Sequence, residues 1–234
     1  MKIINGVNKT DITIEFLDDF HCVKEHCTYN NFKKGQIKNP YDKTHYGIGY
    51  LGEGKYVTWE NGRFTKVYEI WKSLISRCYG ELPGYKAYSG IATICDEWLN
   101  FQNFAEWWTN EKYDCDGRLH LDKDILFDGN KEYSPDKCLL VPQKINMLFM
   151  DYRPNKDGLP HGIGKAANGR YSSAYRGKSL GVFNTLEKAI AVHDIARLDY
   201  INEVTEGQKD TLPIKVYNAL KNYVYRQREL MKVA

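Results

Sequence analysis

The hydrophobic and polar positions divide the first half of the chain into segments of different period. Residues 11–16 alternate polar and apolar, as a half-buried strand does, and an acidic pair supplies a turn before a second short strand at 20–23. Helical spacing follows over 67–79 and ends near Gly80, and an aromatic helix is predicted over 100–109. The chain therefore begins with a β-hairpin and continues with helices that bury one face each. We expect the tryptophans and phenylalanines of this region to be core residues rather than base-stacking platforms.

The pattern changes after residue 150. Residues 151–160 are rich in proline, glycine and polar side chains and are predicted to be a linker. Helical spacing returns over 186–200, and again from Pro213 onward, where the last helix carries an excess of basic residues. This basic helix could lie along phosphates, mediate self-association or be a plain solvated helix. Its basic residues are Lys215, Lys221, Arg226, Arg228 and Lys232, against the single acidic Glu229.

Composition narrows the class of protein. The chain has 234 residues, of which 42% are hydrophobic and 27% charged, enough for one large or two to three small folded domains. Its net charge is only +3, so any affinity for nucleic acid must come from local patches. No apolar run approaches the roughly 18 residues of a membrane span, and no signal peptide is recognisable. We expect a soluble, cytoplasmic protein with no membrane partner, and its oligomeric state stays open.

Six cysteines are spread singly, with no pair at the two-residue spacing of zinc knuckles. Disulfides are not expected in a reducing compartment. Cys78, Cys95 and Cys138 could join a histidine on a structural zinc, but small buried cysteines are the default, and structural Zn²⁺ is not expected.

A lysine-rich segment over 29–41 interleaves cations with aromatic and amide side chains. It suits phosphate contacts, with the apolar bodies anchoring the charged tips, and it equally suits an ordinary surface turn. The glycines between 47 and 54 lack the Gly-Lys-Ser/Thr ending of a phosphate loop, so nucleotide binding is not predicted.

A set of ordered motifs carries a family resemblance over about half of the chain. The motifs are Tyr68-Glu69-Ile70-Trp71, Arg77-Cys78-Tyr79, Tyr88-Ser89-Gly90-Ile91, Cys95-Asp96-Glu97-Trp98, Phe101-Gln102-Asn103-Phe104, Leu121-Asp122-Lys123-Asp124-Ile125, Asn130, Tyr133-Ser134-Pro135, Cys138 and Asn146. With them the sequence resembles phage HNH-like (ββα-metal) endonucleases, which implies a β-hairpin packed on a helix around one divalent cation.

The resemblance implies roles for individual residues. Asp122 would be the metal ligand on the strand and Asn146 the ligand on the helix, with Mg²⁺ as the compatible cation. Asn130 matches the asparagine that braces the loop, and Lys123 occupies the position of the catalytic histidine. A lysine with a pKa of about 10.4 is charged at neutral pH, so it suits a phosphate contact better than a proton acceptor. Strand alternation places Arg118, His120 and Asp122 on one face, which makes His120 the alternative catalytic base.

Acidic residues are concentrated around this core. They are compatible with a hard cation, or they form a solvated acidic loop with a turn at Asp128-Gly129-Asn130. The eight carboxylates are Glu111, Asp114, Asp116, Asp122, Asp124, Asp128, Glu132 and Asp136.

A second group of motifs lies between residues 162 and 196. They are Gly162-Ile163, Gly169-Arg170-Tyr171, Ala174-Tyr175-Arg176, Gly177-Lys178, Leu180-Gly181-Val182-Phe183, Thr185, Glu187-Lys188-Ala189 and Ala191-Val192-His193-Asp194-Ile195-Ala196. With them the sequence resembles the ethylene-response-factor (Apetala-type) DNA-binding domain. That family places a three-stranded antiparallel sheet in the DNA major groove and packs one helix across the back of the sheet. The resemblance assigns DNA contacts to Lys165, Arg170, Tyr171, Arg176 and Lys178. A tyrosine stands where plant members usually have tryptophan, so their base preference does not transfer. The alternative is a solvated scaffold.

The sequence thus predicts an α+β protein in four parts. They are an N-terminal β-rich module at 1–58, an HNH-like domain at 59–150, an ethylene-response-factor-like domain at 151–204 and a basic helix at 205–234. The resemblance implies a double-stranded-DNA-binding protein of phage or mobile-element type. Either it is a metal-dependent HNH-like endonuclease or nickase, or it is a non-catalytic DNA-binding regulator with a degenerate HNH core.

Overall fold

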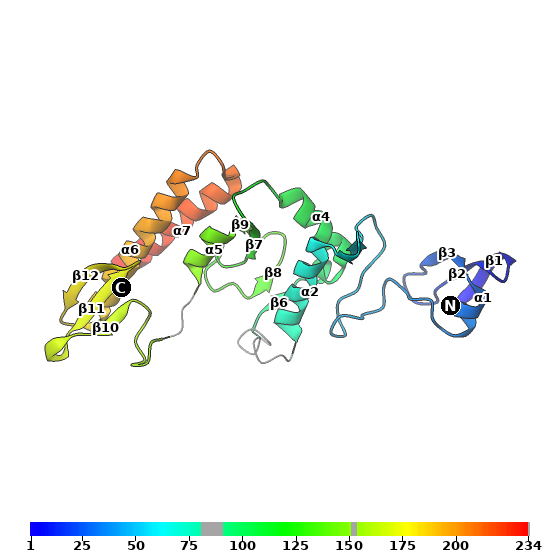
Figure 1. Cartoon of the computed structure of the whole chain (residues 1–234), viewed down its shortest axis with the longest axis horizontal. Coiled ribbons are helices and arrows are strands. Elements are labelled where there is room, and N and C mark those ends of the chain that lie inside the picture. Colours follow the sequence, from blue (N-terminus) through cyan, green and yellow to red (C-terminus); the bar gives the residue numbers. More distant parts are fainter. Residues whose placement is uncertain (81–90, 151–153, 234) are drawn as a thin grey trace. The chain divides into compact units, whose positions relative to one another are not determined.

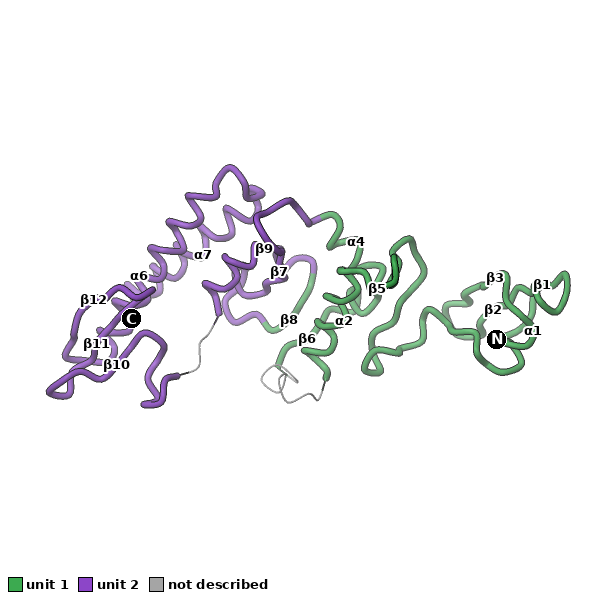
Figure 2. Tube along the Cα trace, in the orientation of Figure 1, with its two compact units in different colours: residues 1–110, 131–134 green, residues 111–130, 135–234 purple. Residues whose placement is uncertain are grey.

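The structure, a computed structural model, describes residues 1–80, 91–150 and 154–233, which form two compact units (Figure 2). Unit 1 contains residues 1–110 and 131–134, and unit 2 contains 111–130 and 135–234. Both combine helices with small sheets, which confirms the α+β class. Residues 88–90 of one predicted motif, and 151–153 of the predicted linker, lie outside the described residues.

Unit 1 begins with an antiparallel sheet in the order β1-β2-β3, formed by β1 (Lys2–Asn8), β2 (Asp11–Glu15) and β3 (Val23–Cys27) and followed by α1 (Tyr29–Lys33). The predicted hairpin is present, although its second strand starts at residue 23 instead of 20. The sequence missed β1 because all seven of its residues are exposed, and such a strand has no alternation to detect. The small core under this sheet consists of Ile12, Ile14, Phe16, Cys22 and Cys27.

The rest of unit 1 is an aromatic core enclosed by short elements. They are β4 (Trp59–Glu60), β5 (Arg63–Phe64), α2 (Lys66–Tyr79), β6 (Thr93–Ile94), α3 (Asp96–Leu99), α4 (Phe101–Glu111) and β8 (Glu132–Tyr133), which pairs in parallel with β6. The indole of Trp71 is fully buried and donates to the Trp98 carbonyl at 2.8 Å. Phe101 and Phe104 are also fully buried, which confirms that these aromatic residues are core.

Unit 2 contains an antiparallel strand pair with a helix directly after it. β7 (Leu119–Asp122) pairs with β9 (Leu139–Pro142), and α5 (Gln143–Asn146) and the 3₁₀ turn η2 (Met147–Phe149) follow. The C-terminal helix α7 (Ile214–Val233) packs on this group. The shared core consists of Ile125, Leu139, Val141, Ile145, Leu212, Val216, Ala219 and Leu220.

The remainder of unit 2 is a second antiparallel sheet, in the order β10-β11-β12, with one long helix. Its elements are β10 (Ile163–Lys165), η3 (Ala167–Gly169), β11 (Tyr171–Tyr175), β12 (Lys178–Phe183) and α6 (Leu186–Gly207). Ala189 of α6 packs against Ile163 of the sheet, while Leu198 and Ile201, later in the helix, pack with Val224 of α7. Helix α6 therefore contributes to the core beneath the sheet and to the core it shares with α7. It runs beside α7 for much of its length (Figure 1).

The segment between α5 and this sheet is more ordered than a linker where the structure describes it. The Asn155 side chain accepts from the backbone N–H groups of Asp157 and Leu159 at 2.9 and 3.0 Å. Leu159 is buried in the core beneath the sheet. Residues 155–159 therefore form a turn that docks on the sheet.

The basic residues of α7 are engaged within unit 2. Lys215 contacts Glu111 at 3.0 Å, Lys221 contacts Glu206 at 2.5 Å, and Arg228 contacts Asp199 at 2.5 Å. Arg226 donates to the Ile125 carbonyl at 2.8 Å, and Lys232 contacts Glu229 at 2.7 Å. Of the three alternatives for this helix, the plain solvated helix does not hold, because one face of α7 is core and its cations have acidic or carbonyl partners. No helix of the described residues is long and apolar enough to span a bilayer.

The packing of α7 predicts a matched pair of stability effects. Leu220 is fully buried, whereas Tyr225 on the same helix is 66% exposed. Leu220→Ala should lower the free energy of unfolding by about 2–5 kcal/mol, because it leaves a cavity in the core. Tyr225→Ala should change it by less than about 0.5 kcal/mol. Urea unfolding followed by far-ultraviolet circular dichroism measures both, and equal effects would contradict the placement of α7.

Candidate functional site

The strand pair β7 and β9 positions the residues that the sequence singles out for catalysis. His120 lies opposite Val141 and Asp122 lies opposite Leu139. The Gln143 N–H donates to the Arg118 carbonyl at 2.8 Å, which joins the first residue of α5 to the residue before β7. Strand and helix therefore have a fixed relation at this point, and Asn146 at the end of α5 comes close to β7.

His120 and Asn146 are brought together. The Asn146 amide nitrogen lies 3.4 Å from Nδ1 of His120, at the long end of hydrogen-bond distances. With the amide in this orientation Nδ1 accepts, and a neutral imidazole then carries its proton on Nε2. Asn146 Oδ1, the atom that could bind a cation, is left outside this contact. Action of His120 as a base through Nε2 instead requires the amide to turn over, with Oδ1 accepting from Nδ1–H. In that orientation Oδ1 still has a second lone pair, so the two predicted roles, base for His120 and ligand for Asn146, hold together only if this one oxygen serves both.

Asp122 is a buried carboxylate that caps the loop after β7. Its Oδ1 accepts from the backbone N–H groups of Asp124 at 2.9 Å and Ile125 at 2.8 Å. The residue is only 8% exposed, and this burial raises the pKa of its carboxyl, opposed by the two backbone hydrogen bonds. Oδ2 takes no part in these two bonds and is the atom that could bind a cation.

Lys123 and Asn130 close the same loop. The Lys123 ammonium donates to the Asn130 carbonyl at 2.7 Å and to Asp124 Oδ1 at 2.6 Å. The Asn130 amide donates back to the Lys123 carbonyl at 2.9 Å. The Lys123 side chain is only 13% exposed. An ammonium in this position is a hydrogen-bond donor to the loop, so the structure gives no support to Lys123 as a catalytic base, whereas Asn130 does brace the loop.

Several of the surrounding carboxylates contact basic side chains. Glu111 contacts Lys215, Asp116 contacts Lys144, and Asp128 lies 3.5 Å from Arg226. Within the described part of the chain, no three His, Cys, Asp or Glu side chains are arranged to hold a metal ion. These contacts favour the solvated-loop interpretation for the three carboxylates that make them. Of the cysteines considered for zinc, Cys78 and Cys138 are buried and Cys95 is half-buried.

The residues fit a hard cation by type, through one carboxylate oxygen of Asp122 and one amide oxygen of Asn146. Mg²⁺ commonly takes one or two carboxylates and completes its octahedron with substrate phosphate and water. A cation beside Asp122 would also offset the burial of its charge.

The sheet β10-β11-β12 has two different faces. Ile163, Tyr171 and Phe183 pack toward α6, and Ser173 is buried with them. Residues directly opposite each other on antiparallel strands share a face, and successive residues alternate. The outer face, defined here as the one turned away from α6, therefore carries Gly164, Ser172, Ala174, Ser179 and Val182.

The predicted DNA contacts do not lie on the outer face. Lys165 pairs with Tyr171, and Lys178 pairs with Tyr175, so register places these lysines on the side of α6, at the two ends of the sheet. Tyr171 packs on the core, which favours a structural role over a base contact. The Arg176 guanidinium lies 4.1 Å from the centre of the Tyr200 ring on α6. Arg170 is exposed in the turn before β11. The basic residues thus mark the ends of the sheet.

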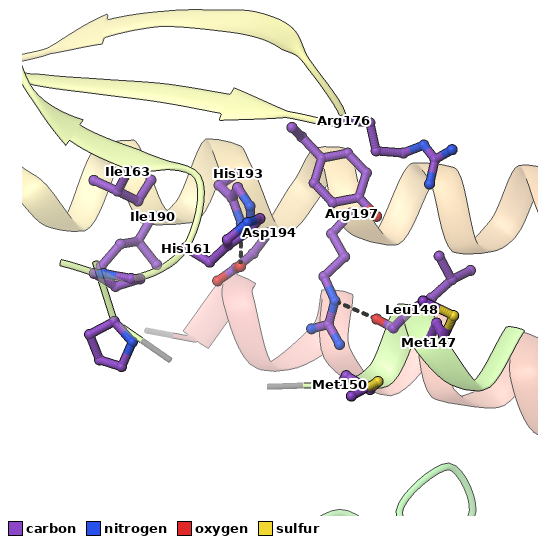
Figure 3. Close-up of a pocket in the computed structure, with 13 residues that line it drawn as sticks. Met147, Leu148, Met150, His161, Ile163, Arg176, Ile190, His193, Asp194 and Arg197 are labelled. Atoms are coloured by element: carbon purple, nitrogen blue, oxygen red, sulfur yellow. Dashed lines mark hydrogen bonds and ion pairs between the residues drawn. The ribbon is translucent and has the colours of Figure 1, made fainter. Parts of the chain in front are cut away.

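A cavity of about 430 Å³ lies on the α6 side of this sheet, and the sequence did not predict it. Figure 3 shows His193 and Arg197 projecting from α6, with η2 across from them. Arg197 Nε donates to the Leu148 carbonyl at 3.0 Å, and His193 Nδ1 lies 3.2 Å from Asp194. His193 Nε2 is buried with no hydrogen-bond partner among the described residues. Helical spacing indicates which residues of α6 face inward, but not that they border a cavity.

Comparisons with known proteins found no counterpart. No family model matches the chain, and no curated protein or solved structure is significantly similar to it. The family resemblances stated above therefore rest on the sequence motifs alone.

The environment of Asp122 predicts that Asp122→Asn stabilises the protein at neutral pH. The raised pKa means that the folded state binds this proton more tightly than the unfolded state does, so the stability contributed by protonation is lost as pH rises through the folded pKa. Asparagine keeps the Oδ1 acceptor for both N–H groups and carries no buried charge. Its gain over wild type should shrink toward zero below the ordinary aspartate pKa of about 3.9. Urea unfolding at several pH values measures it, and a loss of stability at pH 7 would contradict the assignment.

Proposed function

We propose that this chain is a double-stranded-DNA-binding protein whose β7–β9–α5 group is an HNH-type, metal-dependent endonuclease or nickase centre. One observation supports catalysis most: Nδ1 of His120, on strand β7, lies 3.4 Å from the amide nitrogen of Asn146, on helix α5. Strand β7 also carries Asp122. These are the positions where the resemblance puts a proton acceptor and the two metal ligands. An origin in a phage or mobile element, with action in the host cytoplasm, belongs to the same proposal.

The roles follow from the atoms left available. Asp122 Oδ2 and Asn146 Oδ1 would hold Mg²⁺, which when bound offsets charge on the cleaved phosphate and its leaving oxygen. His120 is the imidazole close enough to this group to accept a proton from the attacking water, in the orientation where Asn146 accepts from Nδ1–H. Lys123 and Asn130 act indirectly, because they close the loop that Asp122 caps.

DNA binding is supported by the charge of the second sheet. From Gly158 to Leu186 the sequence contains four Lys and Arg residues and no Asp or Glu. The strands are three and antiparallel, with one helix across a single face, as in the sheet-based readers that enter a DNA groove. The basic ends of the sheet can then contact phosphates at two points along a groove.

A second function, a non-catalytic DNA-binding regulator, is favoured by the use of Asp122 and Lys123 in folding. Asp122 Oδ1 is committed to the loop, and the lysine at the catalytic-histidine position is committed to Asn130. Under this alternative the hairpin and helix serve as a scaffold for DNA binding.

Nicking of supercoiled plasmid separates the two functions. Wild type should nick in Mg²⁺ or Mn²⁺ and not in chelator. Asp122→Asn, which keeps the loop cap, and His120→Gln should each lower the rate about 100-fold or more. The control is Asp116→Asn, which removes an exposed carboxylate of the same unit paired with Lys144 and should nick like wild type. Plasmid binding without nicking under all metal conditions would favour the regulator, and full activity of Asp122→Asn would refute its role as ligand.

Salt dependence tests the DNA-binding sheet. The triple variant Lys165→Gln, Arg170→Gln, Lys178→Gln should reduce the slope of log affinity against log salt by about 2.7, or about 0.9 for each lost phosphate contact. The control variant Lys144→Gln, Lys215→Gln, Lys232→Gln removes the same charge from paired lysines and should leave the slope near the wild-type value. Fluorescence anisotropy with a labelled duplex measures both. Equal losses in the two variants would show that only net charge matters.

A further inference from the structure

The outer face of the second sheet carries no charged or amide side chain. All of its strand residues are described, and by register it presents two serines, one alanine, one valine and one glycine. Val182 is 48% exposed and Ser179 is exposed. A Cβ on Gly164 would come within 2.9 Å of Ser172 Oγ, which independently places Gly164 and Ser172 side by side on this face.

Two local features of the chain produce this face. The β11–β12 turn uses left-handed residues, Arg176 at φ 49° and Gly177 at φ 78°, which close a two-residue hairpin and turn the arginine out of the strands. A bulge in β12 then shifts the register, since Ser173 pairs with Gly181 and Ala174 with Ser179. Beyond the bulge, Val182 points outward and Phe183 points to the core. Without the shift the alternation along β12 would be reversed.

The dimensions and charge of this surface fit the major groove of duplex DNA. Three strands about 4.8 Å apart span roughly 10 Å, and the groove is about 12 Å wide. Cationic side chains stand at both strand ends and register places none on the outer face, so their long side chains can reach phosphates along the groove while the middle stays neutral. Duplex DNA is therefore the occupant that the charge distribution favours.

The chemistry of the face limits what it can read. Guanine is recognised by arginine or lysine and adenine by asparagine or glutamine, and the outer face has none of these. The apolar groups that register assigns to it are the methyls of Ala174 and Val182, while Leu180, at the bulge, has no register partner. The apolar feature of a base edge in the major groove is the thymine C5 methyl. Serine hydroxyls accept or donate with any base and give little discrimination. We propose that the sheet recognises thymine methyl groups in duplex DNA, through Ala174 and Val182, and holds the duplex by phosphate contacts from its basic ends.

This inference rests on the proposed DNA binding and adds its substrate preference. The expected selectivity is modest, about fourfold in affinity for each methyl group contacted, because it depends on burying single methyls. The protein should thus prefer thymine-rich duplexes over a wide range of sequences instead of selecting one defined site.

Replacing thymine with uracil removes the methyl group and keeps the base pairing. The full chain in chelator should bind an adenine–thymine duplex about fourfold or more tightly than the matching adenine–uracil duplex, by fluorescence anisotropy. It should likewise bind a guanine–cytosine duplex more tightly when the cytosines carry a 5-methyl group. Val182→Ser should reduce both ratios toward one without changing the salt slope. The control Val57→Ser alters a valine that is 55% exposed in unit 1 and should keep both ratios.

The outcomes distinguish a failure of thymine-methyl recognition from a failure of DNA binding. Salt-dependent binding with equal affinity for thymine and uracil duplexes would overturn the methyl readout and leave DNA binding intact. Methyl selectivity that survives in Val182→Ser and in Ala174→Gly, with both variants folded by circular dichroism, would also overturn it. Absence of binding to every duplex would overturn the proposed function together with the inference.

Discussion

The candidate catalytic group depends on the complete burial of strand β9. Leu139, Leu140 and Val141 are each at most 1% exposed, and Leu139 and Val141 share a core with α7. A strand held in this way fixes the register of β7, and through Gln143 it fixes the start of α5. The positions of His120, Asp122 and Asn146 therefore follow from apolar packing that involves none of them. Removing that packing would lower the free energy of unfolding by several kcal/mol and would also displace the candidate catalytic residues.

The polar residues of the same region serve the fold first. Asp122 caps the loop through one oxygen, while Lys123 and Asn130 exchange hydrogen bonds across its ends. Buried polar groups need hydrogen-bond partners, and here the residues that the motif singles out for catalysis supply those partners to the backbone of the loop. The Asp122 carboxylate can cap the loop through Oδ1 and still offer Oδ2 to a cation. The Lys123 ammonium is enclosed by loop acceptors, so its role in this structure is to hold the loop.

In the second sheet, backbone geometry decides where the charges go. Two adjacent left-handed residues close the β11–β12 turn, and the bulge in β12 resets which residues face outward. The consequence is a neutral outer face between basic ends, although the strand sequence reads as a mixture of serine, arginine and lysine. Tyr200 of α6 adds to this division, because its ring lies under the Arg176 guanidinium. DNA affinity and base selectivity would then come from different parts of one small sheet.

The sequence by itself determined the elements that periodicity and side-chain chemistry control. These include the helix over 67–79, found at α2 (Lys66–Tyr79), and the buried aromatic core, whereas the bracing position of Asn130 came from the family resemblance. It missed β1, whose residues are all exposed, because hydrophobic periodicity detects only elements that bury a face. Tertiary structure alone decided that α7 is part of the core, since the partners of Leu220 and Val216 come from β9, about 75 residues earlier in the chain. It also decided that Lys123 closes a loop, that Asn146 meets His120, and that the basic residues leave the outer face. Each of these depends on register, turn geometry or contacts between distant segments, which no local pattern of residues contains.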